Sequence, residues 1–170
     1  MKRLLLVLAC ITVLSTTGLA QEAPANEKAS LKGLKGIYVL IEDLSDEFKD
    51  SNLIKNQLKT DAELRLKKAG IHLFDRSEAI RDHAVGTLYI QSNFIRLDPP
   101  KGQFAFHLLI EINQDVSLIR DSSIHVFNAR TYSVPGYTGT ISEDSLRGLR
   151  NPVNDLVDVF IKDFLAANSR

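Results

Sequence analysis

The side chains that could do acid–base or metal chemistry are thinly spread along this chain. None of the four histidines lies three or four residues from another histidine, or in a cluster of cysteine, histidine and carboxylate at ligand spacing. We therefore expect no metal site. The histidines are His72, His83, His107 and His125.

Motifs for covalent or cofactor chemistry are missing from the sequence. It contains no G-x-S-x-G, no S-x-x-K, no P-loop and no G-x-G-x-x-G. Glu111 and Asp115 lie four apart on one predicted strand, which separates their carboxylates by about 13 Å. That separation lies outside the windows that glycosidases use. The sequence thus predicts no catalytic residue, no cofactor and no enzyme.

A polar strand face is the best candidate for binding. Residues 104–118 alternate between even positions that are apolar except for Gln114 and mostly polar odd positions, which predicts a strand with one buried and one wet face. A turn centred near Pro100 would place His107 opposite Asn93. The face is either ordinary solvated surface or the place where a ligand or partner binds. Its candidate residues are Tyr89, Gln91, Asn93, His107, Glu111 and Asn113.

A second candidate is the Gly- and Pro-containing stretch 133–140, together with the residue before it. Tyr132 and Tyr137 look exposed there. The stretch is either a simple turn or a recognition loop.

The N-terminus has the layout of a secretory signal. Lys2 and Arg3 precede an apolar run of eleven residues, and small residues occupy the −3 and −1 positions before a cut after Ala20. Eleven residues span about 16 Å, too short for a bilayer core of roughly 30 Å. Cys10 loosely resembles a lipoprotein cysteine, but the apolar run continues through it, so we expect no lipidation.

Cleavage after Ala20 would leave a chain without cysteine, and so without a disulfide framework. The net charge would fall from zero to −2, because Lys2 and Arg3 are lost. A near-neutral chain without a basic run is not expected to bind nucleic acid. Possible partners are another envelope protein or a small ligand, with no transmembrane span in the mature chain; the oligomeric state stays open.

The remaining pattern predicts one domain over residues 35–170, preceded by a flexible leader over residues 21–34. A helix over residues 52–69 ends at Gly70, and a short helix follows over residues 76–83 with Ser77 as a possible cap. The last helix begins at a capping box, Thr140 to Glu143, and Pro152 is expected to kink it or split it with Asn151 as a second cap. Strands are expected over residues 37–44, 71–74, 87–97, 104–118 and 124–132.

These elements define the expected fold class, which is α+β. We expect a two-layer sandwich whose mixed five-stranded sheet combines a βαβ unit with an antiparallel three-strand meander. The two long helices would cover one face of the sheet. A strand as long as residues 104–118 should contain a bulge or bend.

Several segments resemble a group of small secreted bacterial proteins of unknown function. They are ELRLKKAGI (63–71), LYI (88–90), QDVSLIRD (114–121), Leu146-Arg147 and LVDVFIKDFL (156–165). The resemblance covers most of the mature chain, but its motifs are structural and imply no catalytic residue. We expect an exported, non-catalytic binding or accessory module of the bacterial envelope, found in the periplasm or secreted. The alternative is a small periplasmic hydrolase or ligand-binding enzyme that uses the open sheet face.

Overall fold

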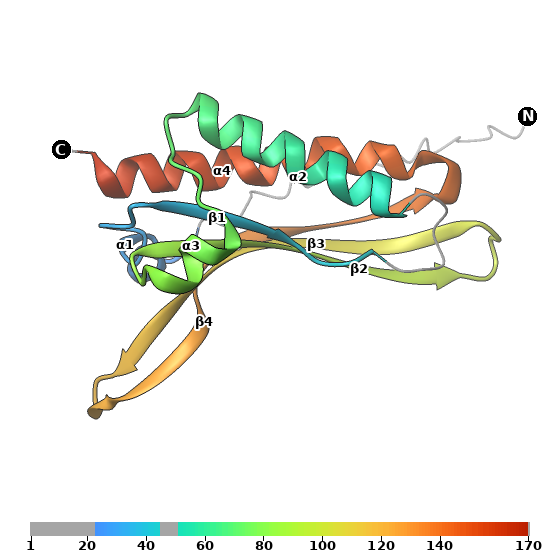
Figure 1. Cartoon of the computed structure of the whole chain (residues 1–170). Helices are drawn as coiled ribbons and strands as arrows, with labels where there is room; N and C mark the ends of the chain where they lie inside the picture. Colours follow the sequence, from blue (N-terminus) through green and yellow to red (C-terminus); the bar gives the residue numbers. More distant parts are fainter. Residues whose placement is uncertain (1–22, 45–50, 170) are drawn as a thin grey trace, which may run out of the picture.

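The computed structural model describes residues 23–44 and 51–169. Its helices are α1 (Ala25–Ala29), α2 (Ser51–Lys68), α3 (Arg76–Arg81), the 3-10 helix η1 (Glu143–Leu149) and α4 (Arg150–Asn168). Its strands are β1 (Gly36–Ile41), β2 (Val85–Leu97), β3 (Gln103–Leu118) and β4 (Asp121–Ser142). The long helices α2 and α4 lie side by side on one face of the sheet, and α3 lies on the opposite side (Figure 1).

The sheet has four strands in the order β1-β2-β3-β4, so the prediction of five strands was wrong. Residues 71–74 form only one isolated bridge, between Leu73 and Ile37. The reason is a lack of chain, because Gly70 ends one helix and Asp75 already caps the next. The predicted strand 124–132 and loop 133–140 both belong to the single strand β4. The fold is nevertheless α+β, with β1 parallel to β2 and an antiparallel meander from β2 to β4.

The alternation of β3 determines which side of the sheet is buried. Its even residues from Phe104 to Ile112 are all buried, and they form the core with the apolar rows of α2 and α4. The odd residues over the same stretch are only half-buried. The strand pairs with β2 so that His107 lies opposite Asn93, which confirms the predicted register. Burial of one face fixes that register, because a slip by one residue would expose every core side chain.

The helix α2 ends as the sequence predicts. Gly70 adopts a left-handed conformation with φ of 78°, and the N–H of Ile71 donates to the carbonyl of Leu66 at 3.0 Å. This closure satisfies a carbonyl that the helix would otherwise leave open. The short helix α3 is capped by Asp75 rather than Ser77, in a complete capping box with Glu78.

The last helix begins later than expected. Thr140 belongs to β4, and residues 143–149 form the 3-10 helix η1 instead of α-helix. Pro152 falls in the first turn of α4, where its missing N–H costs no intrahelical hydrogen bond. The proline therefore neither kinks nor splits α4, and Asn151 lies inside the helix rather than capping it.

The expected flexible leader differs most from the structure. Residues 25–29 form α1, and Leu31 behind it is fully buried in the core. The Glu27 carboxylate accepts hydrogen bonds from the N–H of Ser133 at 3.0 Å and from its hydroxyl at 3.3 Å. The hydroxyl of Ser30 donates to the carbonyl of Thr131 at 3.2 Å. Charged and small residues made this stretch look disordered, but they pack against the outer edge of β4. The predicted signal segment lies outside the described residues.

The end of the β3–β4 hairpin leaves the body as a two-stranded ribbon, which we call the arm (residues 114–130; Figure 1). The pairing of β3 with β2 stops at Asn113, whereas its pairing with β4 continues. The register between β3 and β4 shifts four times, and each shift places the extra residues on β4. Asn128, in one of these bulges, has φ of 55°. The irregularity expected for the long strand thus occurs, but on its partner strand.

Ion pairs between Arg and Asp connect the two long helices. Arg150 holds Asp61 through two hydrogen bonds of 2.6 and 2.9 Å, and Arg65 reaches Asp158 at 2.6 Å. The hydrogen bond from Arg150 is the main reason why the pKa of Asp61 lies below its usual value of 3.8. The Asp61 side chain is 19% exposed, so the pair is partly screened.

Replacing Arg150 by Gln should lower the free energy of unfolding at pH 7 by the small amount that a partly screened surface ion pair contributes. Because the folded pKa of Asp61 is depressed, the pair stabilises the fold above pH 3.8 and loses its effect as pH falls through the folded value. Urea unfolding at pH 7 and at pH 2.5 measures the difference. The variant Arg147→Gln, at an exposed position on η1, serves as control. Equal losses in the free energy of unfolding for both variants at pH 7 would contradict a stabilising Arg150–Asp61 ion pair.

Candidate binding surfaces

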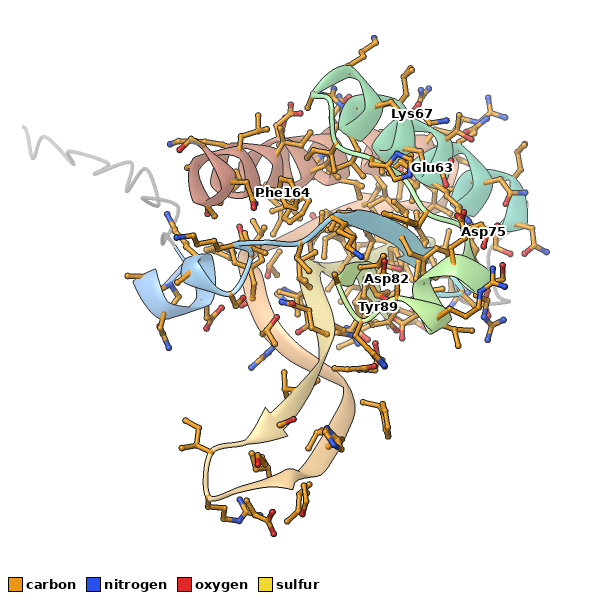
Figure 2. All side chains as sticks on the ribbon, turned by 60° about the vertical axis from the view of Figure 1, so that its left-hand side comes forward. Glu63, Lys67, Asp75, Asp82, Tyr89 and Phe164 are labelled. Carbon is orange, nitrogen blue, oxygen red and sulfur yellow. The ribbon has the colours of Figure 1, made fainter. Side chains whose placement is uncertain are left out.

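The polar residues predicted to share a face do lie together, on the side of the sheet opposite to α2 and α4. Tyr89 faces Glu111, and Asn93 faces His107, across the β2–β3 pair. Gln91 and Asn113 continue the two rows, opposite Leu109 and Thr87. Figure 2 shows Tyr89 on this open side of the sheet. The Oδ1 atom of Asn113 is buried and accepts no hydrogen bond from a described residue.

His107 is held in place by β4 rather than left free for a ligand. Its Nδ1 lies 3.0 Å from the hydroxyl oxygen of Thr138. Its ring lies over Gly136, where a side chain would overlap it: a Cβ would meet the His107 ring, and it would lie 2.9 Å from the carbonyl oxygen of Leu108. Gly136 thus makes room for the imidazole.

The variant Gly136→Ala should destabilise the protein by roughly 1–3 kcal/mol, the usual cost of overpacking. Removing the ring in the double variant His107→Ala/Gly136→Ala should recover part of that loss, because the contact of 2.9 Å with the backbone carbonyl oxygen of Leu108 remains. Thermal unfolding of the parent, both single variants and the double variant measures the coupling. Strictly additive effects would show that the ring does not rest on Gly136.

Acid–base chemistry on this face is restrained by the surroundings of its groups. Burial, and then the hydrogen bond with Glu42, raise the pKa of Tyr89 to about 12, so its phenol stays protonated near neutral pH. The Glu111 carboxylate lies 3.1 Å from the guanidinium of Arg130, and its side chain is 14% exposed. Both groups are engaged with neighbours on the sheet. No group of three His, Cys, Asp or Glu side chains that could hold a metal ion occurs within residues 23–44 and 51–169.

The two tyrosines expected in a surface loop lie on the helix-covered side of the sheet. Tyr132 is fully buried, and its hydroxyl donates to the Asp163 carboxylate at 3.0 Å. Lys28 of α1 approaches the same carboxylate at 3.3 Å. Tyr137 is half-exposed and stacks on Phe106 at 6.0 Å between ring centroids. The expectation of a loop over residues 133–140, whether a simple turn or a recognition loop, was wrong, because these residues continue the strand β4.

The Tyr132 hydroxyl should matter for stability while that of Tyr137 should not. Tyr132→Phe leaves a nearly buried carboxylate with one donor fewer, at a cost of about 1–3 kcal/mol. Tyr137→Phe removes a hydroxyl with no described partner and should change the free energy of unfolding by less than about 0.5 kcal/mol. Chemical denaturation of the two variants compares the same atomic change at two sites. Similar losses in the free energy of unfolding for the two variants would contradict the buried hydrogen bond of Tyr132.

A cavity opens on the same side of the sheet, between α3 and the base of the arm; we call it the α3–arm groove. It has a volume of about 440 Å³. Strand β1 supplies Tyr38 and Leu40, and the arm supplies Asp115, Phe127 and Asn128. The other lining residues are Arg76, Ala79, Ile80, His83 and Thr87. Figure 2 shows α3, marked by Asp75 at its start, beside the arm.

A small hydrogen-bonded cluster fixes the width of the groove. The Asp115 carboxylate accepts a hydrogen bond from the N–H of Asn128 at 3.0 Å, and its other oxygen lies 2.8 Å from Nδ1 of His83. His83 follows α3, whereas Asp115 and Asn128 lie on opposite strands of the arm. The cluster therefore connects the helix side of the groove to its arm side.

The arm itself exposes apolar side chains beyond the groove. Val116 and Val126 are register partners, and Leu118 and Ile124 continue the row on the two strands. Ile124 and Val126 are exposed, and Ile119 at the tip is fully so. Large apolar side chains gathered on a projecting ribbon are typical of a binding surface.

Sequence reasoning missed the groove and the arm. Ile80 and Phe127 are 69% and 71% exposed, and the predicted helix over residues 76–83 and strand over residues 124–132 gave no sign that these two side chains line one cavity. The groove depends on where α3 lies relative to the arm, and no local pattern encodes that distance. One usable signal existed: residues 114–130 contain no Lys, Pro or Gly, which is unusual for an exposed hairpin.

The fold and these surfaces define an α+β domain with a projecting ribbon. A comparison with known protein families finds no match, and a comparison with curated proteins finds none either. The family resemblance noted from the sequence stays a prediction. No helix within the described residues is long and apolar enough to cross a membrane.

Two solved structures are distantly similar. One is a minor lipoprotein from Acinetobacter baumannii, with 11% identity and a TM-score of 0.43, covering 79% of this chain and 93% of that one. The other is a dodecamer of a PelC variant from Paraburkholderia phytofirmans, with 14% identity and a TM-score of 0.40, covering 82% and 92%. Likenesses this distant say nothing about function.

Proposed function

We propose that this chain is an exported, non-catalytic binding protein of the bacterial envelope, and that its arm binds an extended segment of a partner protein. The secretory layout of residues 1–20 supports export. The observation that carries the binding function is the arm, a two-stranded ribbon with exposed apolar side chains and a free strand edge (Figure 1).

The edges of the arm favour strand addition. Residues 114–118 of β3 have no partner strand on the β2 side, because that pairing stops at Asn113. A two-stranded ribbon is marginal in water on its own, whereas a third strand stabilises it. Partner recognition by strand addition combines backbone hydrogen bonds with pockets for alternate side chains. The exposed apolar row beside the edge would take those side chains.

The amino-acid composition of the arm also favours strand addition. Exposed strand edges are commonly protected by lysine or proline, and residues 114–130 contain neither. Two aspartates and two arginines leave the arm without formal net charge. Such an arm does not repel a chain of either charge, so its apolar row and its backbone would select the partner.

The surroundings of the polar groups support a non-catalytic role. His107 is held by Thr138, Glu111 is paired with Arg130, and the raised pKa of Tyr89 makes it a poor base near neutral pH. A general base needs a pKa near the working pH and a free approach to its substrate. The polar rows of the open face therefore serve better as a sheet surface than as reacting groups.

Introducing lysines into the apolar row tests the arm. We expect the double variant Ile124→Lys/Val126→Lys to bind about tenfold less of an exported partner protein than the parent does. The measurement is a quantitative pull-down from envelope extract of the source organism, with bound proteins identified by mass spectrometry. A photo-crosslinker at the fully exposed Ile119 should capture the same protein.

The control is Leu53→Lys/Leu64→Lys, which places the same charges at exposed apolar positions of α2. It should bind the partner like the parent. If the arm variant keeps its partner while its melting temperature is unchanged, the arm is not the binding surface. If the parent retains no exported protein above background, the proposed function itself is wrong.

A further inference from the structure

The α3–arm groove has a largely apolar wall, and no described side chain fills it. Leu40, Ile80 and Phe127 come from β1, α3 and the arm, and all three are exposed while lining one cavity. The ring of Tyr38 completes the apolar wall. Exposed apolar side chains from three separate elements around one cavity are typical of a ligand site. The volume of about 440 Å³ suits a small ligand rather than a large one.

One cation that lines the groove has no hydrogen-bonded or ion-paired partner among the described residues. Both carboxylate oxygens of Asp115 are hydrogen-bonded, one to His83 and the other to the N–H of Asn128, and neither bond involves Arg76. Outside the groove, Lys59 lies 5.7 Å from the Tyr38 ring centroid and pairs with Glu63 at 3.8 Å. Arg76 lines the groove and makes no hydrogen bond or ion pair with any described residue.

The acidic neighbours of Arg76 do not supply its partner. The Asp75 carboxylate accepts hydrogen bonds at 2.8 Å from the N–H of Glu78 and from the hydroxyl of Ser77. The Glu78 carboxylate accepts in return from the N–H of Asp75, also at 2.8 Å. Both acids therefore serve the capping box of α3. The guanidinium of Arg76 remains available to an anion at the mouth of the groove.

We propose that the α3–arm groove binds a carboxylate with a compact apolar body, with Arg76 holding the carboxylate and Leu40, Ile80 and Phe127 contacting the body. A guanidinium binds a carboxylate through two parallel hydrogen bonds. One guanidinium without a described partner matches a single carboxylate. The carboxylate of a fatty acid and the C-terminus of an apolar peptide share this chemistry.

The groove and the apolar row of the arm share no residue, although Asp115 of the groove also lies on the free edge of β3. The row lies on Val116, Leu118, Ile124 and Val126, none of which lines the groove. Ligand binding therefore goes beyond the proposed function, and either can fail alone. The variant Ile124→Lys/Val126→Lys should bind a groove ligand like the parent.

Calorimetric titration of the purified protein with octanoate tests the site. We expect octanoate to bind, and Arg76→Gln to weaken its binding by roughly tenfold, the effect of losing one charge-assisted hydrogen-bonded pair. Arg81→Gln removes the same charge from the same helix outside the groove and should leave the affinity unchanged. Octanol should bind the parent and Arg76→Gln equally, while Phe127→Ser should weaken both ligands.

A second titration distinguishes the two sources of the carboxylate. The peptide acetyl-Ala-Ala-Leu with a free C-terminus binds better than octanoate if the site takes peptide ends, and worse if it takes fatty acids. Its C-terminal amide should bind at least about tenfold more weakly. The proposal is overturned if neither carboxylate binds the parent, or if Arg76→Gln and Arg81→Gln bind octanoate equally.

Discussion

The fold depends on β3 burying its even side chains on one face while its backbone pairs with β2 on one side and β4 on the other. From Phe104 to Ile112 these side chains are buried beneath α2 and α4. The β2 pairing is regular over its whole length. All extra residues are taken up by β4, the outermost strand, where a bulge displaces no further strand. The irregularity is thereby kept away from the core.

The length of β2 determines where the arm begins, because β2 does not pair with β3 beyond Asn113. Because β2 begins only at Val85, the continuation of β3 beyond Asn113 has no neighbour there, and it leaves the sheet with β4 as the arm. The segment before β2 carries α3 to the foot of the arm, where His83 meets Asp115. One chain geometry therefore produces both the free ribbon and the groove beside it.

Much of the body could be predicted from sequence, because its patterns are local. The helix ending at Gly70, the buried face of β3 and the pairing of His107 with Asn93 all follow from spacing and turn position. The missing fifth strand could not be predicted this way, since residues 71–74 are apolar enough for a strand but lack the length to pair. Tyr132 was misplaced because Pro135 and Gly136 read as a turn, whereas they form a bulge within β4. The groove depends on long-range placement, which no local pattern contains.

The helix α1 limits the addition of a strand at the outer edge of β4 beside the arm. Glu27 takes up the N–H of Ser133, and Ser30 donates to the carbonyl of Thr131, so the outer edge of β4 is occupied next to the arm. Further out, the same strand is interrupted by bulges and by the left-handed Asn128. The regular edge on the arm is that of β3, at residues 114–118. Because the described part of the arm offers one regular edge, the arm can accept one added strand, which favours closed complexes of defined stoichiometry over open-ended fibres.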